Sequence, residues 1–459
     1  MLDQIDLLVL LAAMLAIVFA GVHVAVALGV TAILGLVMMT GDFATASTFV
    51  ANTGYEALRD YVLAVIPLFM LMGEFLARCG AARDMFALVN RACRWLPGRL
   101  GIATVLANGI FAFVSGVSIA AAATFSRIAY PEMKRAGYEP RFAVGCIAGS
   151  AVLGMLIPPS VLMIVWGVLT ETSIGGLFLA GVMPGLLLIA YYVLYILARA
   201  WRDPAAVGEA RAPSTVGAQH VAVRGRRPLP MPVENGHAES SGAAGTLAVL
   251  GLVATVLAGI WAGAFTPTEG AAVGAVASLL LAVARGLRGK EIVEVVISVA
   301  RTSGPLLLLL FAAQLYSRTL AMTGVTNMVQ NALVGTGLGP LAVLALMVLI
   351  WFILGCLIDS ISIILLTAPV FYPVAMALGF DPLAFAIIAI LAIETGLLTP
   401  PFGILVFTVR ASLAGEGIPT GTIFRGAIPY WIALLGVIAS VVAFPQVANW
   451  LPKLAFGAG

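Results

Sequence analysis

Polar and small residues interrupt long apolar stretches at two places in this chain, and a proline pair follows each interruption. The first place contains Ser115-Gly116-Val117-Ser118 and is followed by Pro158-Pro159, and the second contains Ser360 and Ser362 and is followed by Pro400-Pro401. The candidate hydroxyls are those of Ser115, Ser118, Ser360, Ser362, Thr395 and Thr399, and the glycines that would let the backbone approach are Gly116, Gly154, Gly355 and Gly396. Broken helices free carbonyl groups and half-helix ends, which suit a cation such as Na⁺ and an anionic carboxylate, respectively.

Other interpretations of these residues stay open at this stage. Serine and threonine in membrane helices often pack or bond to their own backbone, and a proline pair can be a simple kink. Asp359 and Glu394 are charges inside apolar segments, which are energetically expensive and therefore suggest function. Each of them either neutralises a cation, holds a helix break, or faces the interface with a scaffold.

The composition places these residues in a membrane. The 459-residue chain is 62% hydrophobic and only 10% charged, with a mean hydropathy of +1.10, whereas a soluble domain carries about 25% charged residues. The apolar runs at 7–39 and 247–284 are long and continuous, unlike the alternating segments of a membrane barrel. We therefore predict an all-α polytopic membrane protein.

Several function classes find no support in the sequence. The four cysteines are scattered without metal-binding spacing, and the three histidines form no constellation. No phosphate-binding loop is present, so we expect no ATP hydrolysis by the chain itself. An intramembrane enzyme would need a polar catalytic cluster, such as a metal-binding His/Asp set, and the sequence shows none. The net charge of +3 gives no reason to expect a nucleic-acid partner. Asp3 and Asp6 replace the basic start of a signal peptide, so we expect the first helix to be retained.

Basic residues define the expected topology. They gather at 78–99, 134–141, 199–227, 285–301 and 410–425, and the positive-inside rule places these segments in the cytoplasm. The N-terminus is then periplasmic. The stretch 100–131 begins and ends in the cytoplasm, and each of its limbs is too short for a full span. We therefore predict a re-entrant hairpin there.

A repeat divides the chain into halves. At an offset of 242 residues, Ser118 matches Ser360, Tyr130-Pro131 matches Tyr372-Pro373, and Pro158-Pro159 matches Pro400-Pro401. The second hairpin, about 341–376, has no basic flanks and should open to the periplasm, so the repeats are inverted, as in many secondary transporters. We predict a first repeat at 1–199, a cytoplasmic linker at 200–245 and a second repeat at 246–459.

These motifs resemble the large membrane subunit (M subunit, DctM-like) of the tripartite ATP-independent periplasmic (TRAP) transporters, in the ion transporter superfamily. The matching segments are 113–118, 130–138, 154–160, 266–272 and 396–401. The family often has a further serine where Val117 stands. The resemblance implies an inner-membrane permease that imports a carboxylate, such as a C4-dicarboxylate or sialic acid, with a Na⁺ gradient and an elevator movement of a transport domain against a scaffold.

The resemblance also implies partners and site residues. The partners are a small four-helix membrane (Q) subunit and a periplasmic substrate-binding (P) protein. One Na⁺ site would use Ser115, Ser118, Gly154 and Pro158, and the other Gly355, Gly396 and Thr399. We expect the substrate near Gly116, Ser360, Ser362 and Thr395. Glu269 has a different expected role, because glutamate favours the first turn of a helix: we expect it to cap the helix that follows Thr266. The alternative function is a stand-alone Na⁺- or H⁺-coupled carrier or antiporter without a binding protein.

Overall fold

The protein is helical throughout the part of the chain that the structure describes. This computed structural model describes residues 4–208, 242–335 and 337–457, in which the only extended pairing is an isolated bridge between Tyr138 and Val207. Within these ranges, seven helical stretches are long and apolar enough to cross a membrane. A helix forms hydrogen bonds between its own backbone N–H and C=O groups, which is necessary in lipid because no water is available to bind them. The predicted all-α polytopic class is therefore confirmed.

The first half contains eleven α-helices within the described residues. They are α1 (Gln4–Phe19), α2 (Val24–Thr40), α3 (Phe43–Arg59), α4 (Val65–Arg78), α5 (Ala81–Ala92), α6 (Arg99–Ser115), α7 (Ser118–Arg135), α8 (Pro140–Ala151), α9 (Leu153–Leu156), α10 (Val161–Thr170) and α11 (Ile174–Arg202), with short 3₁₀ turns η1 (Tyr61–Ala64) and η2 (Pro204–Ala206).

The second half contains ten α-helices within the described residues. They are α12 (Gly242–Trp261), α13 (Pro267–Ala284), α14 (Gly289–Thr323), α15 (Val325–Gly335), α16 (Pro340–Gly355), α17 (Ser360–Ala377), α18 (Pro382–Gly396), α19 (Ile404–Ser412), α20 (Thr420–Ala443) and α21 (Gln446–Phe456), with the 3₁₀ turn η3 (Ala414–Glu416).

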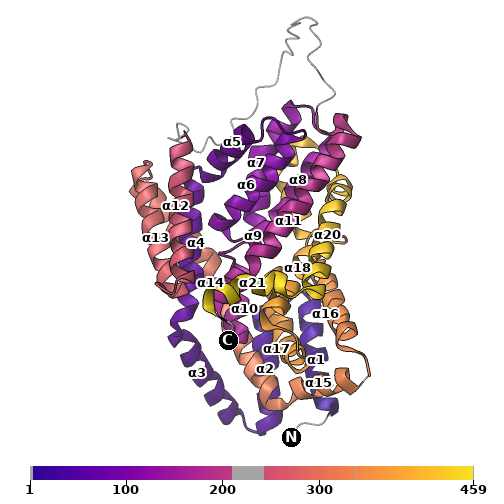
Figure 1. Ribbon diagram of the computed structural model, residues 1–459. Helices are drawn as coiled ribbons and strands as arrows, with labels where there is room; N and C mark the ends of the chain where they lie inside the picture. The colour runs from indigo at the N-terminus through magenta and orange to yellow at the C-terminus, as the bar shows by residue number, and fades with distance from the viewer. Residues whose placement is uncertain (1–3, 209–241, 336, 458–459) are drawn as a thin grey trace, which may run out of the picture.

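Two helical hairpins enter from opposite ends of the molecule. The first is formed by α6 and α7 and occupies the upper half of Figure 1, whereas the second, formed by α16 and α17, occupies the lower half. A broken helix accompanies each hairpin: Pro158-Pro159 separates α9 from α10, and Pro400-Pro401 separates α18 from α19. The predicted inverted arrangement of hairpins and proline-broken helices is therefore confirmed.

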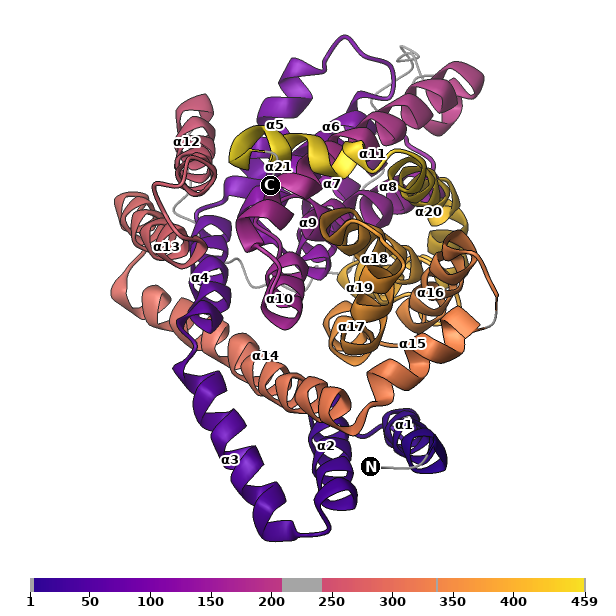
Figure 2. The same cartoon turned by 60° about the horizontal axis from the view of Figure 1, so that its bottom comes forward.

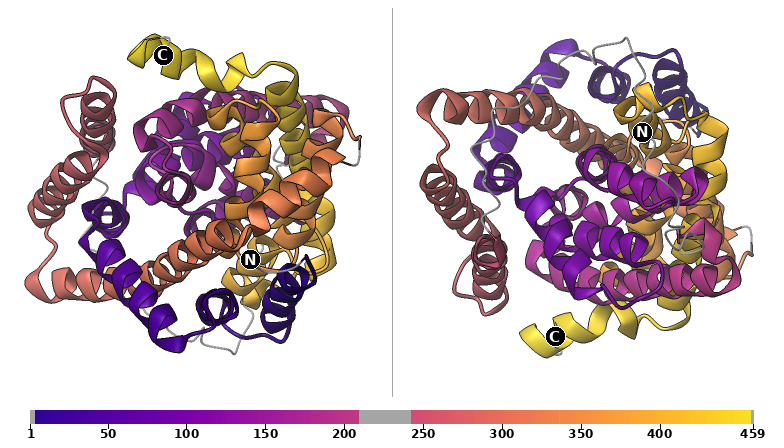
Figure 3. Two further views of the ribbon diagram at one scale, coloured as in Figure 1. Left: turned by 90° about the horizontal axis from the view of Figure 1, so that it is seen from below. Right: turned by 90° about the horizontal axis from the view of Figure 1, so that it is seen from above.

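Seven further helices in the described part of the chain form an outer arm, which we define as α1–α4 and α12–α14. The 35-residue α14 packs along α2 and α4, and α13 packs along α4. Figures 2 and 3 show this arm running around one side of the hairpin body, which we define as α6–α11 and α16–α20. Thr266 and Glu269 form a capping box at the start of α13, so the predicted capping role of Glu269 is confirmed.

Aromatic side chains join the two halves within the hairpin body. The ring of Trp166 on α10 packs edge-on against Trp351 on α16, with 6.3 Å between the ring centroids. Phe385 on α18 contacts both rings. The indole N–H of Trp351 donates to the Thr367 hydroxyl at 2.8 Å. Such buried aromatic pairs stabilise packing beyond their area alone, so the two repeats share one core.

The helix α3 was not predicted. It is amphipathic rather than continuously apolar, and it exposes Phe43, Tyr55 and Leu58, so a search for long apolar runs overlooks it. The predicted linker at 200–245 lies mostly outside the described residues. At its edges, α11 continues to Arg202 and α12 begins at Gly242.

Candidate functional site

The tip of the first hairpin is a two-residue break between α6 and α7. Gly116 has a φ of +60°, and Val117 is extended, so a new helix starts at Ser118. A Cβ on Gly116 would lie 2.6 Å from the carbonyl oxygen of Pro159. Glycine alone combines this left-handed backbone with so close a contact.

The broken helix of the first half lies directly against this tip. The backbone N–H of Val161 donates to the carbonyl of Gly116 at 3.3 Å. A Cβ on Gly154 would lie 3.0 Å from the carbonyl carbon of Val117. The Pro158-Pro159 peptide bond is cis. The structure thus brings together the four positions predicted for the first Na⁺ site: Ser115, Ser118, Gly154 and Pro158.

Two hydroxyls at this tip are buried without partners. Ser115 Oγ and Ser118 Oγ make no hydrogen bond to any described residue. A small cavity of about 10 Å³ adjoins Ser115 and Gly116 and is closed on the other side by Phe69 and Met70 of α4. That volume suits one water-sized species. A buried hydroxyl oxygen without a partner beside a space of this size, as at Ser115, fits a small cation, and the space is too confined for an organic anion.

The second tip is also packed closely against its broken helix. A Cβ on Gly396 would lie 2.5 Å from the Cα of Gly355, so α18 and α16 touch backbone to backbone. The Thr399 hydroxyl donates to the Gly396 carbonyl at 2.9 Å and lies 2.9 Å from the sulfur of Cys356. The three positions predicted for the second Na⁺ site are therefore adjacent. Cys356 was not predicted to belong to this site. It directly follows Gly355 in the sequence, and this neighbouring position could have identified it.

The predicted substrate positions have different surroundings. Gly116 forms the first tip, and the Ser360 hydroxyl donates to Glu394 Oε1 at 2.8 Å. The hydroxyls of the other two positions are already bonded within their own segments: Ser362 donates to Asp359, and Thr395 donates to the carbonyl of Leu391 at 2.6 Å. Gly116 and Ser360 thus lie at the first and second hairpin break, respectively, whereas the hydroxyls of Ser362 and Thr395 are engaged within their own segments.

The two intramembrane acids have separate roles in the fold. Asp359 is the N-cap of α17, and its Oδ1 accepts a hydrogen bond from the backbone N–H of Ser362 at 3.0 Å. This is the usual function of an aspartate at a helix start. Glu394 instead has an exposed fraction of only 1%. The two acids therefore differ in their structural role: Asp359 holds a helix end, and Glu394 faces the hairpins.

Glu394 connects the two hairpins at a site that we call the hairpin junction, formed by Ser118, Ser360 and Glu394. Ser118 is close enough to interact with the same carboxyl group that accepts from Ser360. Neither Ser118 Oγ nor Glu394 Oε2 forms a hydrogen bond of normal geometry with a described residue. The first residues of α7 and α17 thus converge on one carboxyl group, where helix N-termini favour negative charge. The sequence identified Glu394 as a charge inside an apolar segment, but it could not predict which residues surround this carboxyl group.

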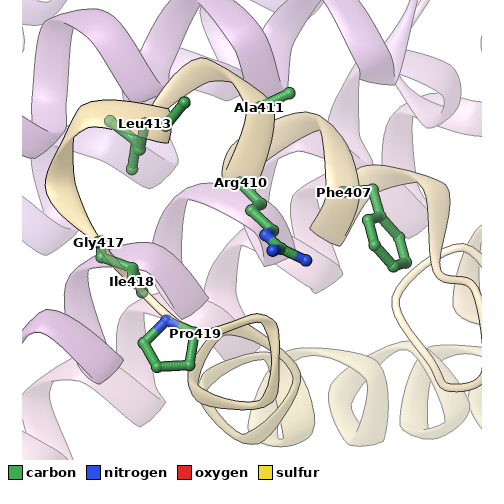
Figure 4. A pocket seen from close by; sticks show the side chains of 8 residues that line it. Phe407, Arg410, Ala411, Leu413, Gly417, Ile418 and Pro419 are labelled. Carbon is green, nitrogen blue, oxygen red and sulfur yellow. The ribbon is translucent and has the colours of Figure 1, made fainter.

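A larger hollow lies at the far end of α19, roughly 13 Å along the helix from Gly403. Its volume is about 520 Å³, and Phe407, Arg410 and Pro419 are among the residues that line it. Figure 4 shows Arg410 between Phe407 and Pro419, and its guanidinium group donates to the Thr420 hydroxyl at 2.6 Å. This hollow is separate from the hairpin junction and was not predicted.

The family model of the tripartite ATP-independent periplasmic transporter, DctM component, matches residues 9–447. The chain belongs to this family. It is a TRAP transporter large permease, so it is a polytopic inner-membrane transport protein and not an enzyme. The predicted resemblance is confirmed by this match over nearly the whole chain.

Full-length relatives agree with this assignment. The chain is 35% identical to the C4-dicarboxylate TRAP transporter large permease protein DctM of Pseudomonas aeruginosa, over 87% of this chain and 88% of that protein. It is 31% identical to the sialic acid TRAP transporter large permease protein SiaM of Vibrio cholerae, over 97% and 98%. It is 29% identical to the ectoine/5-hydroxyectoine TRAP transporter large permease protein UehC of Ruegeria pomeroyi, over 96% and 98%.

A solved structure shares the fold. The YdaH transporter of Alcanivorax borkumensis, described as having an unusual topology, superposes with a TM-score of 0.62 at 15% identity. The match covers 89% of this chain and 90% of that one. The likeness supports the helical architecture of the TRAP permease and carries no information about its substrate.

Proposed function

We propose that this TRAP permease imports a small organic anion with a carboxylate group, driven by a Na⁺ gradient through an elevator mechanism. Relatives are named for C4-dicarboxylates, sialic acid and ectoine, which favours a carboxylate substrate. The observation that supports the Na⁺ proposal is the pair of buried hydroxyl oxygens of Ser115 and Ser118, neither of which has a hydrogen bond of normal geometry among the described residues, together with the cavity of about 10 Å³ that adjoins Ser115.

Electrostatics support a cation at this place. A carboxylate buried like that of Glu394 is unfavourable unless an opposite charge or several hydrogen bonds compensate it. Its Oε1 has one hydrogen-bond donor, the Ser360 hydroxyl, whereas its Oε2 has no hydrogen bond of normal geometry among the described residues, although the Ser118 hydroxyl lies near the carboxyl group. We propose that Na⁺ bound near the tips supplies the missing compensation. The substrate carboxylate would then approach Gly116 and the start of α17 once the cation charge is present.

The elevator proposal is supported by the division into outer arm and hairpin body. A Cβ on Gly73 of α4 would lie 2.4 Å from the carbonyl oxygen of Val114, so at this point the arm meets the hairpin without a side chain of Gly73 that interlocks with it. Nearby, a cavity of about 380 Å³ separates Tyr61 and Thr266 of the arm side from Glu171 of the hairpin body. We propose that the body moves along α4 and α13.

The partners and the orientation follow from the family and from charge. We propose that a four-helix Q subunit and a periplasmic P protein work with this chain. We also propose that the N-terminus is periplasmic, since this places the arginine-rich segments in the cytoplasm.

The decisive experiment is uptake into proteoliposomes that contain the chain and a Q subunit, with the P protein added outside. A panel of labelled C4-dicarboxylates, sialic acid and 2-oxo acids is offered with an inward Na⁺ gradient and, separately, with choline in its place. We expect uptake of at least one carboxylate, with Na⁺ and P protein both required. If carboxylate uptake is the same in choline, Na⁺ coupling is refuted.

The alternative hypothesis, a stand-alone carrier or antiporter, predicts a different result in the same vesicles. Uptake would then proceed at the full rate without the P protein, and a proton gradient would replace the Na⁺ gradient if H⁺ were the coupling ion. Full activity of the permease alone would therefore support the alternative over the tripartite proposal.

A further inference from the structure

A cavity lined by arginines lies away from the hairpin junction, where α8 and α20 begin and α11 ends. It has a volume of about 290 Å³ and is lined by residues that include Arg141, Arg199, Arg202, Arg425 and Tyr195. These helix ends lie in the upper part of Figure 1, near the point where the chain leaves α11. The same segments were predicted to be cytoplasmic from their basic residues.

Close helix packing creates this cavity. A Cβ on Gly145 of α8 would lie 2.2 Å from the carbonyl oxygen of Gly426 on α20, so the two backbones touch. The contact brings Arg141 and Arg425 together from opposite halves of the chain. Arg141 donates a hydrogen bond to the backbone carbonyl of Arg425 at 3.4 Å. The arginines therefore occupy fixed positions on three helices rather than one flexible loop.

The cavity carries an excess of positive charge. Arg199 pairs with Asp203 at 2.9 Å and with Glu139 at 3.6 Å. Arg141, Arg202 and Arg425 form no ion pair with any residue in 4–208, 242–335 or 337–457. Four guanidinium groups thus face two carboxylates. The positive N-terminal end of α8, which begins at Pro140, adds to this potential.

The geometry fits a phosphate group. A guanidinium group presents paired N–H donors that match phosphate oxygens, and basic pockets between membrane helices on the cytoplasmic side suit lipid headgroups. Phe142, Tyr195 and Pro429 give the same cavity an apolar wall, beside which the glycerol and first acyl carbons can lie. We propose that this cavity binds the phosphate of an anionic phospholipid from the cytoplasmic leaflet. Free phosphate is the other source of the same chemistry.

The test counts lipids bound to the purified full-length chain in detergent by native mass spectrometry. Phosphatidylglycerol and phosphatidylcholine are titrated separately, and inorganic phosphate is added in a third series. The variant R202Q/R425Q removes two arginines of the cavity that form no ion pair with the described residues. The matched control R91Q/R94Q removes the same charge from two exposed arginines outside it. Thermal unfolding of each variant confirms that it is folded.

We expect R202Q/R425Q to weaken phosphatidylglycerol binding about tenfold or more, since each arginine near an anionic surface contributes about 1 kcal/mol. The control should stay within about twofold, and R202K/R425K should retain part of the binding because it keeps the charge. Displacement of the lipid by millimolar phosphate in the wild type alone would identify free phosphate as the source. Equal phosphatidylglycerol binding by wild type and R202Q/R425Q, or no preference over phosphatidylcholine, would overturn the proposal.

Discussion

The two hairpin tips have matching backbones but differ in how far their side chains are already bonded. At the first tip, Ser115 Oγ and Ser118 Oγ are buried without hydrogen-bond partners in the described residues. At the second tip, the hydroxyls of Ser362 and Thr399 bond to Asp359 and Gly396. An unsatisfied buried polar atom is costly, so the first tip gains more from a bound cation than the second.

This difference shows that the two repeats share the glycine positions at which the helices break, but not the hydrogen bonding of the hydroxyl groups beside those breaks. Glycine is required at both tips by contacts under 3 Å. The hydroxyl pattern is free to diverge, because a serine or threonine can turn to its own helix backbone. Four predictions test this comparison, beginning with the largest effect.

Adding one methyl group at either tip should abolish transport. Gly116→Ala and Gly396→Ala each place a Cβ within 2.6 Å of backbone atoms, which forces the tip apart because packed backbone cannot move aside. We expect uptake in proteoliposomes to fall at least about 100-fold for both. The control is Gly304→Ala on α14, where a Cβ would meet nothing within 4 Å. Normal uptake by Gly396→Ala would mean that the second tip tolerates separation, and the backbone equivalence would be lost.

Removing the charge of the hairpin junction should be the next largest effect. Glu394→Gln keeps an acceptor for Ser360 but loses the negative charge, so we expect the Na⁺ concentration for half-maximal uptake to rise about tenfold, which corresponds to about 1.4 kcal/mol. The matched control is Asp359→Asn, because asparagine caps a helix nearly as well as aspartate. Equal Na⁺ dependence in both variants would assign Glu394 a purely structural role.

Side-chain substitutions should separate the two tips. Ser118→Ala removes a buried oxygen that has no hydrogen bond of normal geometry among the described residues, so we expect weaker Na⁺ activation by about threefold to tenfold without loss of thermal stability. Ser362→Ala breaks a bond to Asp359 and should lower stability by about 1 kcal/mol while leaving Na⁺ activation unchanged. Thr399→Ala should also weaken Na⁺ activation, but less than Ser118→Ala. Unchanged activation in both Ser118→Ala and Thr399→Ala would rule out the two-site assignment.

The smallest effect is expected outside both tips. Thr266→Val removes the hydroxyl that accepts from the backbone N–H of Glu269 at 3.2 Å, which should cost about 1 kcal/mol of stability. The outer arm stays in place, so the substrate and Na⁺ dependence of uptake should not change. A change in Na⁺ dependence would show that the arm contributes to ion binding and that the tips alone do not define the site.

Much of the fold could be predicted because it depends on local pattern. Continuous apolar runs indicated membrane helices, and the repeat of Ser118 and Ser360 located both hairpins. Their opposite orientation followed from the arginines in the flanking loops. The amphipathic helix α3 was not predicted, because its apolar residues lie on one face and do not form a continuous apolar run. The predicted Na⁺ positions came together in space, yet their role as ligands remains a prediction.

By itself, the sequence determined where the helices break, since proline, glycine and serine act on the backbone beside them. It also determined which loops are basic, and therefore the proposed orientation. Only the tertiary structure decided which hydroxyls are left without partners, that Glu394 meets both hairpins, and that Arg141 and Arg425 share a cavity. These facts depend on contacts between residues tens to hundreds of positions apart, and the packing of whole helices fixes such contacts rather than the preferences of neighbouring residues.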